Sequence, residues 1–186
     1  MLSYLNQSIT DRDLNFKWFN ELKDIHKGEE AWLFGKGPSF DLFDKSEATG
    51  IKATINEALY FIDSVDYAFT WHVDDKNLKV EGKTQLIDGK RSFSISDIDA
   101  WSPHRKATFI KHGTGELAVS YLIWMGIGKL NFVGMDGTGE YSKDFVWTQP
   151  EGIDADKSDI IRAEIKDRMF KMLNIAGVEY IDHSQA

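Results

Sequence analysis

Polar residues that could bind a ligand follow four short apolar runs of this sequence. They are the turn Gly37-Pro38-Ser39, then Asn56, then the cluster 72–75, and finally Asp136. Each run has the length and composition of a buried strand. Parallel strands meet at one edge of a sheet, where open α/β sheets bind ligands, so we expect the four clusters to line one crevice.

The turn Gly35-Lys36-Gly37-Pro38-Ser39 suits a phosphate group. Its glycines allow backbone conformations that are closed to other residues and bring N–H groups near a ligand, while Ser39 can cap the next helix and supply a hydroxyl. The pattern matches neither the P-loop nor the dinucleotide fingerprint. A plain strand-to-helix turn would need the same glycines and proline for its geometry, so two interpretations stay open.

The cluster His72, Asp74 and Asp75 could hold a divalent cation such as Mg²⁺, because carboxylate oxygens are the ligands that this ion prefers. Adjacent acids after a strand also serve as solvated or capping groups. That second role is the alternative here.

The segment Gly113 to Asp136 has the pattern of a helix followed by a strand. Thr114 supplies a capping hydroxyl, and the apolar run 117–125 predicts a helix that is covered on nearly every side. A strand over 129–133 then leads to Asp136. We expect its carboxylate to face the crevice and to accept hydrogen bonds from a ribose or a base, or else to cap its own turn through the amides of residues 138 and 139.

The remaining elements alternate between strands and helices. Strands are predicted at 31–34, 51–55, 66–71 and 178–181, and helices at 10–27, 40–45, 57–62 and 158–174. This order predicts an α/β fold that is Rossmann-like and doubly wound, with a mostly parallel sheet in three layers.

We expect residues 1–186 to form a single nucleotide-binding domain. Residues 76–106 form an irregular excursion with a strand at 92–95, and another strand is expected at 107–110. The basic spots 90–91 and 104–106 in this region are either surface charge or a clamp for an anionic ligand. The polar and aromatic loop 137–157 is long enough to act as a lid.

Composition excludes several classes of protein. The net charge of −8 argues against a general nucleic-acid or anionic-membrane binder, and the lack of cysteine excludes disulfides and thiol catalysis. No apolar stretch reaches the length of a membrane span, and the N-terminus has no targeting pattern. We therefore expect a cytoplasmic protein with a small-molecule ligand, and the oligomeric state stays open.

Three stretches carry a family resemblance: Leu33 to Ser39, Thr114-Gly115 through Gly126, and Phe132 to Asp136. They resemble the Rossmann-like bacterial sialyltransferases that use CMP-sialic acid, and equally the related domain of archaeal hydroxymethyldihydropterin diphosphokinases. The resemblance implies that the nucleotide is contacted by Gly37, Ser39, Asn56, Thr114, Gly115 and Asp136. Gly35 and Pro38 complete the predicted nucleotide-binding turn.

The resemblance also suggests catalytic residues. Tyr141 follows the GxD turn, where the sialyltransferases place tyrosines that assist the leaving phosphate. Their general-base histidine has no counterpart between Asp136 and His183, so His104, His112 and His72 are the substitutes. Lys36 and Thr114 replace an asparagine and a serine of the family pattern.

Three functions are consistent with these residues. The first is a nucleotide-sugar-dependent glycosyltransferase, with a CMP-type nucleotide as its cofactor. The second is a metal-dependent diphosphokinase of the pterin type that uses Mg²⁺ at the 72–75 cluster, because phosphoryl transfer depends mainly on positioning and charge neutralisation. The third is a non-catalytic nucleotide-binding domain.

Overall fold

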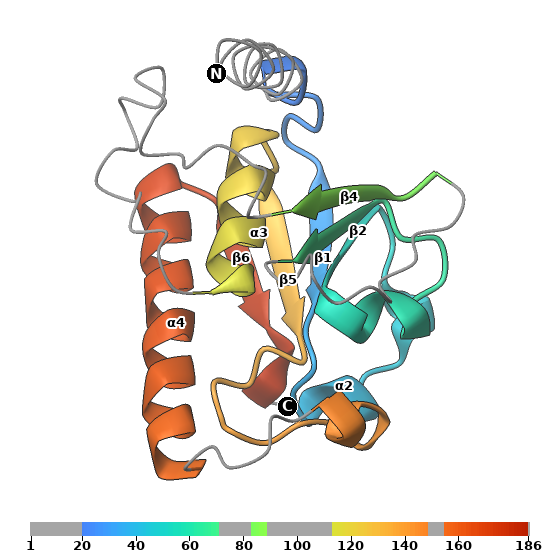
Figure 1. Cartoon of the computed structure of the whole chain (residues 1–186). Coiled ribbons are helices and arrows are strands. Elements are labelled where there is room, and N and C mark those ends of the chain that lie inside the picture. The colour runs from blue at the N-terminus through green and yellow to red at the C-terminus, as the bar shows by residue number, and fades with distance from the viewer. Residues whose placement is uncertain (1–19, 71–82, 89–112, 149–154, 186) are drawn as a thin grey trace, which may run out of the picture.

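A single parallel sheet organises the computed structural model (Figure 1), which describes residues 20–70, 83–88, 113–148 and 155–185. In this part of the chain the sheet has six strands in the order β4-β3-β2-β1-β5-β6, and every pairing is parallel. The strands are β1 (Glu30–Phe34), β2 (Ile51–Ile55), β3 (Tyr67–Thr70), β4 (Gln85–Asp88), β5 (Lys129–Val133) and β6 (Glu179–Asp182). The predicted α/β fold with a parallel sheet is confirmed.

The strand order reverses between β1 and β5. From β1 the chain adds β2, β3 and β4 on one side, and then crosses back to place β5 and β6 on the other. A doubly wound sheet leaves a crevice at such a point, outside the carboxyl ends of the strands. The turns that follow β1 and β5 lie there.

Two helices cover one face of the sheet, α3 (Thr114–Trp124) and α4 (Ala155–Ala176) (Figure 1). The other face is covered by shorter pieces, namely α2 (Ser39–Leu42) and the 3₁₀ helices Lys45–Glu47, Asn56–Phe61 and Lys143–Thr148. The aromatic side chains of Phe34, Phe40 and Phe145 are fully buried under them. The protein therefore has the three predicted layers.

The helix α3 is enclosed, as its apolar sequence predicts. All of its residues are buried. The hydroxyl of Ser120 donates to the Glu116 carbonyl at 2.7 Å, and the Glu116 carboxylate accepts from Arg168 of α4 at 2.6 Å. The bond between Glu116 and Arg168 joins α3 to α4, while the second carboxylate oxygen, Glu116 Oε2, is buried without a hydrogen-bond partner.

The first helix and the 76–106 region differ from their predictions. The first helix does not continue to residue 27: helical structure ends at Glu21, because the amides of Asp24, His26 and Gly28 donate to carbonyls at the end of α3 instead. Residues 76–106 are also not irregular throughout, since β4 lies among them. Its four residues carry too little apolar pattern to be recognised alone, and parallel pairing with β3 is what makes them a strand. The strands predicted at 92–95 and 107–110 lie outside the described residues.

The described part of the 137–157 loop is packed against the rest of the molecule. The Ser142 amide donates to the Lys36 carbonyl at 2.8 Å, and the Phe145 ring is fully buried. The segment then forms a 3₁₀ helix, and α4 begins at Ala155, three residues before the predicted start.

Candidate functional site

The turn after β1 is joined directly to the turn after β5. The Gly35 amide donates to the Val133 carbonyl and the Gly37 amide to the Gly134 carbonyl, both at 2.7 Å. A Cβ atom on Gly35 would lie 2.3 Å from the Gly134 oxygen, and one on Gly37 would lie 2.0 Å from Asp136 Oδ2. Glycine is therefore required here by the close approach of two protein segments, whether or not a ligand binds.

Ser39 and Asp136 bind each other in this junction. The Ser39 amide donates to Asp136 Oδ1 at 3.1 Å, and the Ser39 hydroxyl donates to Oδ2 at 3.0 Å. The same hydroxyl accepts from the Gly134 amide at 2.9 Å. We refer to Gly35, Gly37, Ser39, Gly134 and Asp136 as the turn junction.

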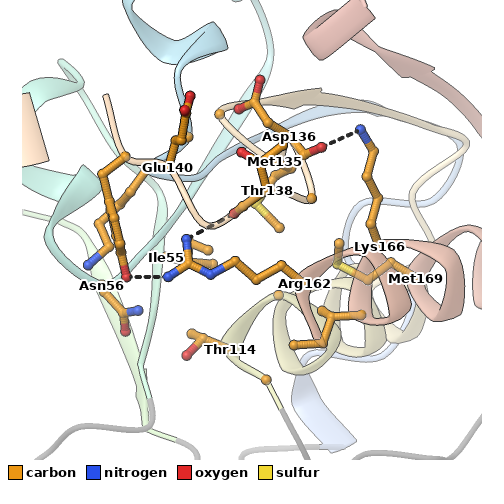
Figure 2. A pocket seen from close by; sticks show the side chains of 18 residues that line it. Ile55, Asn56, Thr114, Met135, Asp136, Thr138, Glu140, Arg162, Lys166 and Met169 are labelled. Atoms are coloured by element: carbon orange, nitrogen blue, oxygen red, sulfur yellow. Dashed lines mark hydrogen bonds between the residues drawn. The ribbon is translucent and has the colours of Figure 1, made fainter. Parts of the chain in front are cut away.

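The capping roles differ from those expected. Pro38 is the N-cap of α2, and Asp136 reaches the start of this helix from another loop. Asp136 does not cap its own turn through the Gly139 amide, which donates to Asp159. The carboxylate points away from Arg162 (Figure 2). That Asp136 contacts a ligand stays a prediction.

Beside the junction lies a cavity of about 320 Å³. Its walls come from the turn after β1, the end of β2, the start of α3, the segment after β5, and α4. Such a volume is at the lower end of the range for small-molecule sites. The cavity thus lies at the carboxyl edge of the sheet, where the sequence predicts the ligand.

Most of the predicted site residues that the structure describes line the cavity, and Gly37 and Asp136 belong to both the cavity and the turn junction. Those that line the cavity are Gly37, Asn56, Thr114, Gly115, Asp136 and Tyr141. Gly35, Pro38 and Ser39 do not line it. The predicted metal ligands His72, Asp74 and Asp75 and the catalytic candidates His104 and His112 lie outside the described residues.

The N-terminus of α3 opens onto the cavity without a side-chain cap. Gly113 is the N-cap and forms no side-chain capping bond, while Thr114 is the first helical residue and not the predicted cap. The first amides of a helix have no partner within it and carry partial positive charge. Gly115 allows close packing here, because a Cβ atom would lie 2.8 Å from both Met135 and Met169.

Asn56 is held in an uncommon conformation at the end of β2. Its φ angle is 50°, in the left-handed region that asparagine tolerates better than most residues. Its Oδ1 atom is buried and has no hydrogen-bond partner. A buried acceptor without a partner is unfavourable, so Asn56 is suited to receive a donor from a ligand.

Arg162 of α4 is the residue that the sequence analysis missed. It extends into the cavity and donates to the Thr138 carbonyl at 3.1 Å and to the Tyr141 hydroxyl at 2.8 Å (Figure 2). Within the part of the chain that the structure describes, it forms no ion pair with a carboxylate. Its position next to Ile161 on the predicted apolar face, four residues before Lys166, was the available signal.

Two lysines complete the charges of the cavity, and each is paired with an acid. Lys36 lies 2.7 Å from Glu57, and Lys166 lies 2.6 Å from Asp182. Burial of Asp182 opposes its ionisation, but hydrogen bonds from Lys166 and Ser184 outweigh this and hold the pKa of the carboxyl below its ordinary value. Asp182 is therefore charged at neutral pH.

Comparison with known proteins does not identify the chain. No family model, no curated protein and no solved structure matches it. Among the described residues, no group of three or more acidic or histidine side chains could hold a metal ion, and no helix has the length and apolar character to cross a membrane.

Proposed function

We propose that the cavity binds the phosphate of a small-molecule ligand, and that this ligand is a nucleotide. The observation that carries the proposal is Arg162, a guanidinium without an acidic partner among the described residues, in a cavity onto which the uncapped N-terminus of α3 opens. Helix N-termini and arginine are the two groups that proteins most often use to bind phosphate.

The rest of the cavity suits a nucleoside. Ile55, Met135 and Ile165 supply apolar surface for a base, and Asn56 Oδ1 supplies an acceptor for an amino group or a sugar hydroxyl. The position at the strand-order reversal of a parallel sheet is also where nucleotides bind in this class of fold.

Nucleotide-sugar transfer is the reaction that we propose for this site, in the cytoplasm. Tyr141 supports it, because its hydroxyl oxygen accepts from Arg162 and its own proton can be donated to a leaving phosphate. Arg162 would stabilise the charge that develops on that phosphate.

The test is binding of CMP, UDP, GDP, ATP and GTP, each with and without Mg²⁺, measured by thermal shift and by calorimetric titration. We expect at least one to raise the melting temperature, because a ligand that binds only the folded state stabilises it. Loss of charged hydrogen bonds costs about 1.5–3 kcal/mol, so Arg162→Gln should weaken that binding by roughly 10- to 100-fold.

Lys171→Gln is the matched control, since it removes one positive charge from the same helix at an exposed ion pair with Asp167. It should bind as the wild-type protein does. Binding of none of the five nucleotides, or equal loss in both variants, would contradict the proposal. A nucleotide that binds only with Mg²⁺ would favour diphosphokinase chemistry over sugar transfer.

A further inference from the structure

Two cations of the cavity contact the same aromatic ring. Lys36 Nζ lies 4.9 Å from the centre of the Tyr141 ring, and Arg162 Cζ lies 4.5 Å from it. The two residues come from different elements, the turn after β1 and α4. The two cationic groups are therefore less than about 10 Å apart, a span that two linked phosphate groups can cover.

The two cations beside Tyr141 differ in their pairing with acids. Glu57 neutralises Lys36, whereas Arg162 has no carboxylate partner in the described part of the chain. Of the acids that line the cavity, Asp136 is bonded to Ser39, and Glu140 is exposed and points away from Arg162 (Figure 2). The start of α3 adds partial positive charge.

Lys36 is positioned to meet an anion. Its side chain is only 12% exposed and lines the cavity, next to the Gly37 backbone. The bond to Glu57 fixes the direction of the ammonium group, which has three N–H donors in total. An ammonium that is mostly enclosed and already oriented can contact a second phosphate at little entropic cost.

We propose that the ligand is a diphosphate: a nucleoside diphosphate, or a sugar nucleotide joined through a diphosphate, in place of the expected CMP-type monophosphate. One phosphate contacts Arg162 and the first amides of α3, and the other contacts Lys36 at the turn after β1. This inference rests on the proposed function, because it assigns two phosphates to the same cavity.

The test compares matched ligand pairs by calorimetric titration of the full chain. The pairs are CMP and CDP, UMP and UDP, GMP and GDP, AMP and ADP, and inorganic phosphate and pyrophosphate, of which the last is independent of the base. We expect the diphosphate member to bind at least tenfold more tightly in every pair that binds, with and without Mg²⁺.

Variants of Lys36 test whether this residue causes the tighter binding of the diphosphate. Lys36→Met should remove most of the preference for the diphosphate and leave monophosphate affinity within about twofold. Because that change leaves the Glu57 carboxylate unpaired, the double variant Lys36→Met with Glu57→Gln is the control for misfolding and should show the same lost preference. Arg162→Gln should weaken both members of a pair.

The outcomes separate the two proposals. Equal affinity for monophosphate and diphosphate, or equal loss of both in the Lys36 variants, would overturn the diphosphate inference and leave phosphate binding intact. If no member of any pair binds, phosphate binding itself is wrong, and the inference falls with it.

Discussion

The turn junction and the cavity lie side by side at the same edge of the sheet, but their polar groups are used differently. In the junction, both Asp136 oxygens, the Ser39 hydroxyl and the Gly37 amide have partners within the protein. In the cavity, Asn56 Oδ1 is unpaired and Arg162 has only neutral acceptors among the described residues. Satisfied groups stabilise a fold, whereas incompletely satisfied groups are available to a ligand.

This contrast changes the role that we assign to the Gly35–Ser39 turn. The features that make it resemble a nucleotide site, two glycines and a serine, are each explained by contact with the turn after β5. Its glycines and serine therefore position the cavity wall, and Lys36 contributes a positive charge to that wall.

The largest expected effect is on stability in the junction. Gly37→Ala places a methyl group 2.0 Å from Asp136 Oδ2, and we expect a loss of about 3 kcal/mol or more in the free energy of unfolding, measured by urea denaturation. Gly28→Ala is the control: its φ angle is +78° with nothing within 4 Å, so only backbone strain of about 1–2 kcal/mol applies. Similar losses in the two variants would show that the junction is not closely packed.

Removing the hydroxyl of Ser39 should have the next largest effect. Ser39→Ala leaves the buried Gly134 amide without a partner and removes the hydroxyl donor to Asp136 Oδ2, which costs about 1–3 kcal/mol. Asp136→Asn should cost a similar amount, and the double variant should cost less than the sum because the two residues share one network. Additive losses in chemical denaturation would mean that they act independently.

The ion pair between Lys166 and Asp182 predicts that stability depends on pH. The folded-state pKa of Asp182 is lowered, so its contribution to stability is present above the unfolded pKa of about 3.9 and is lost as pH falls through the folded value. Asp182→Asn should cost about 1–3 kcal/mol at pH 7 and flatten the slope of stability against pH below about pH 4. An unchanged slope would show that this pair does not contribute.

The sequence predicts the strands of the sheet better than it predicts the candidate site. The strand at 51–55 and the strand at 129–133 have the predicted bounds, because each is a short segment rich in strand-forming apolar residues that ends at turn residues, Asn56 and Gly134. The strand β4 could not be recognised, since its structure comes from pairing and not from its own pattern.

A cavity lies at the sheet edge where the sequence predicts the ligand, but the bonding around that cavity was not predicted. Polar residues after strands correctly indicated the edge of the sheet, and six predicted residues line the cavity there. Sequence alone could not tell that Ser39 and Asp136, 97 residues apart, would bind each other. The only signal for Arg162 was its place beside the predicted apolar face of the last helix, and other charged residues of that helix share it.

The smallest expected change in stability is at Asn56. Asn56→Gly should raise stability in two ways, because glycine adopts a φ of 50° without strain and the unpaired Oδ1 is removed. The greater entropy of the unfolded glycine variant lowers stability. We therefore expect the free energy of unfolding to change by no more than about 1 kcal/mol. Nucleotide binding should weaken nonetheless. A large loss of stability, with nucleotide binding unchanged, would show that Asn56 stabilises the fold and does not contact the ligand.

The central claim is that the cavity binds the ligand and the junction holds the fold. Its most direct test is to measure, in parallel, the melting temperature and the pyrophosphate affinity of Arg162→Gln and Asp136→Asn. We predict that Arg162→Gln keeps its stability within about 1–2 kcal/mol and loses affinity at least tenfold, since the fold loses only two hydrogen bonds to neutral oxygens and one contact with the Tyr141 ring. Asp136→Asn should lose stability and keep its affinity, and the reverse pattern would contradict the account.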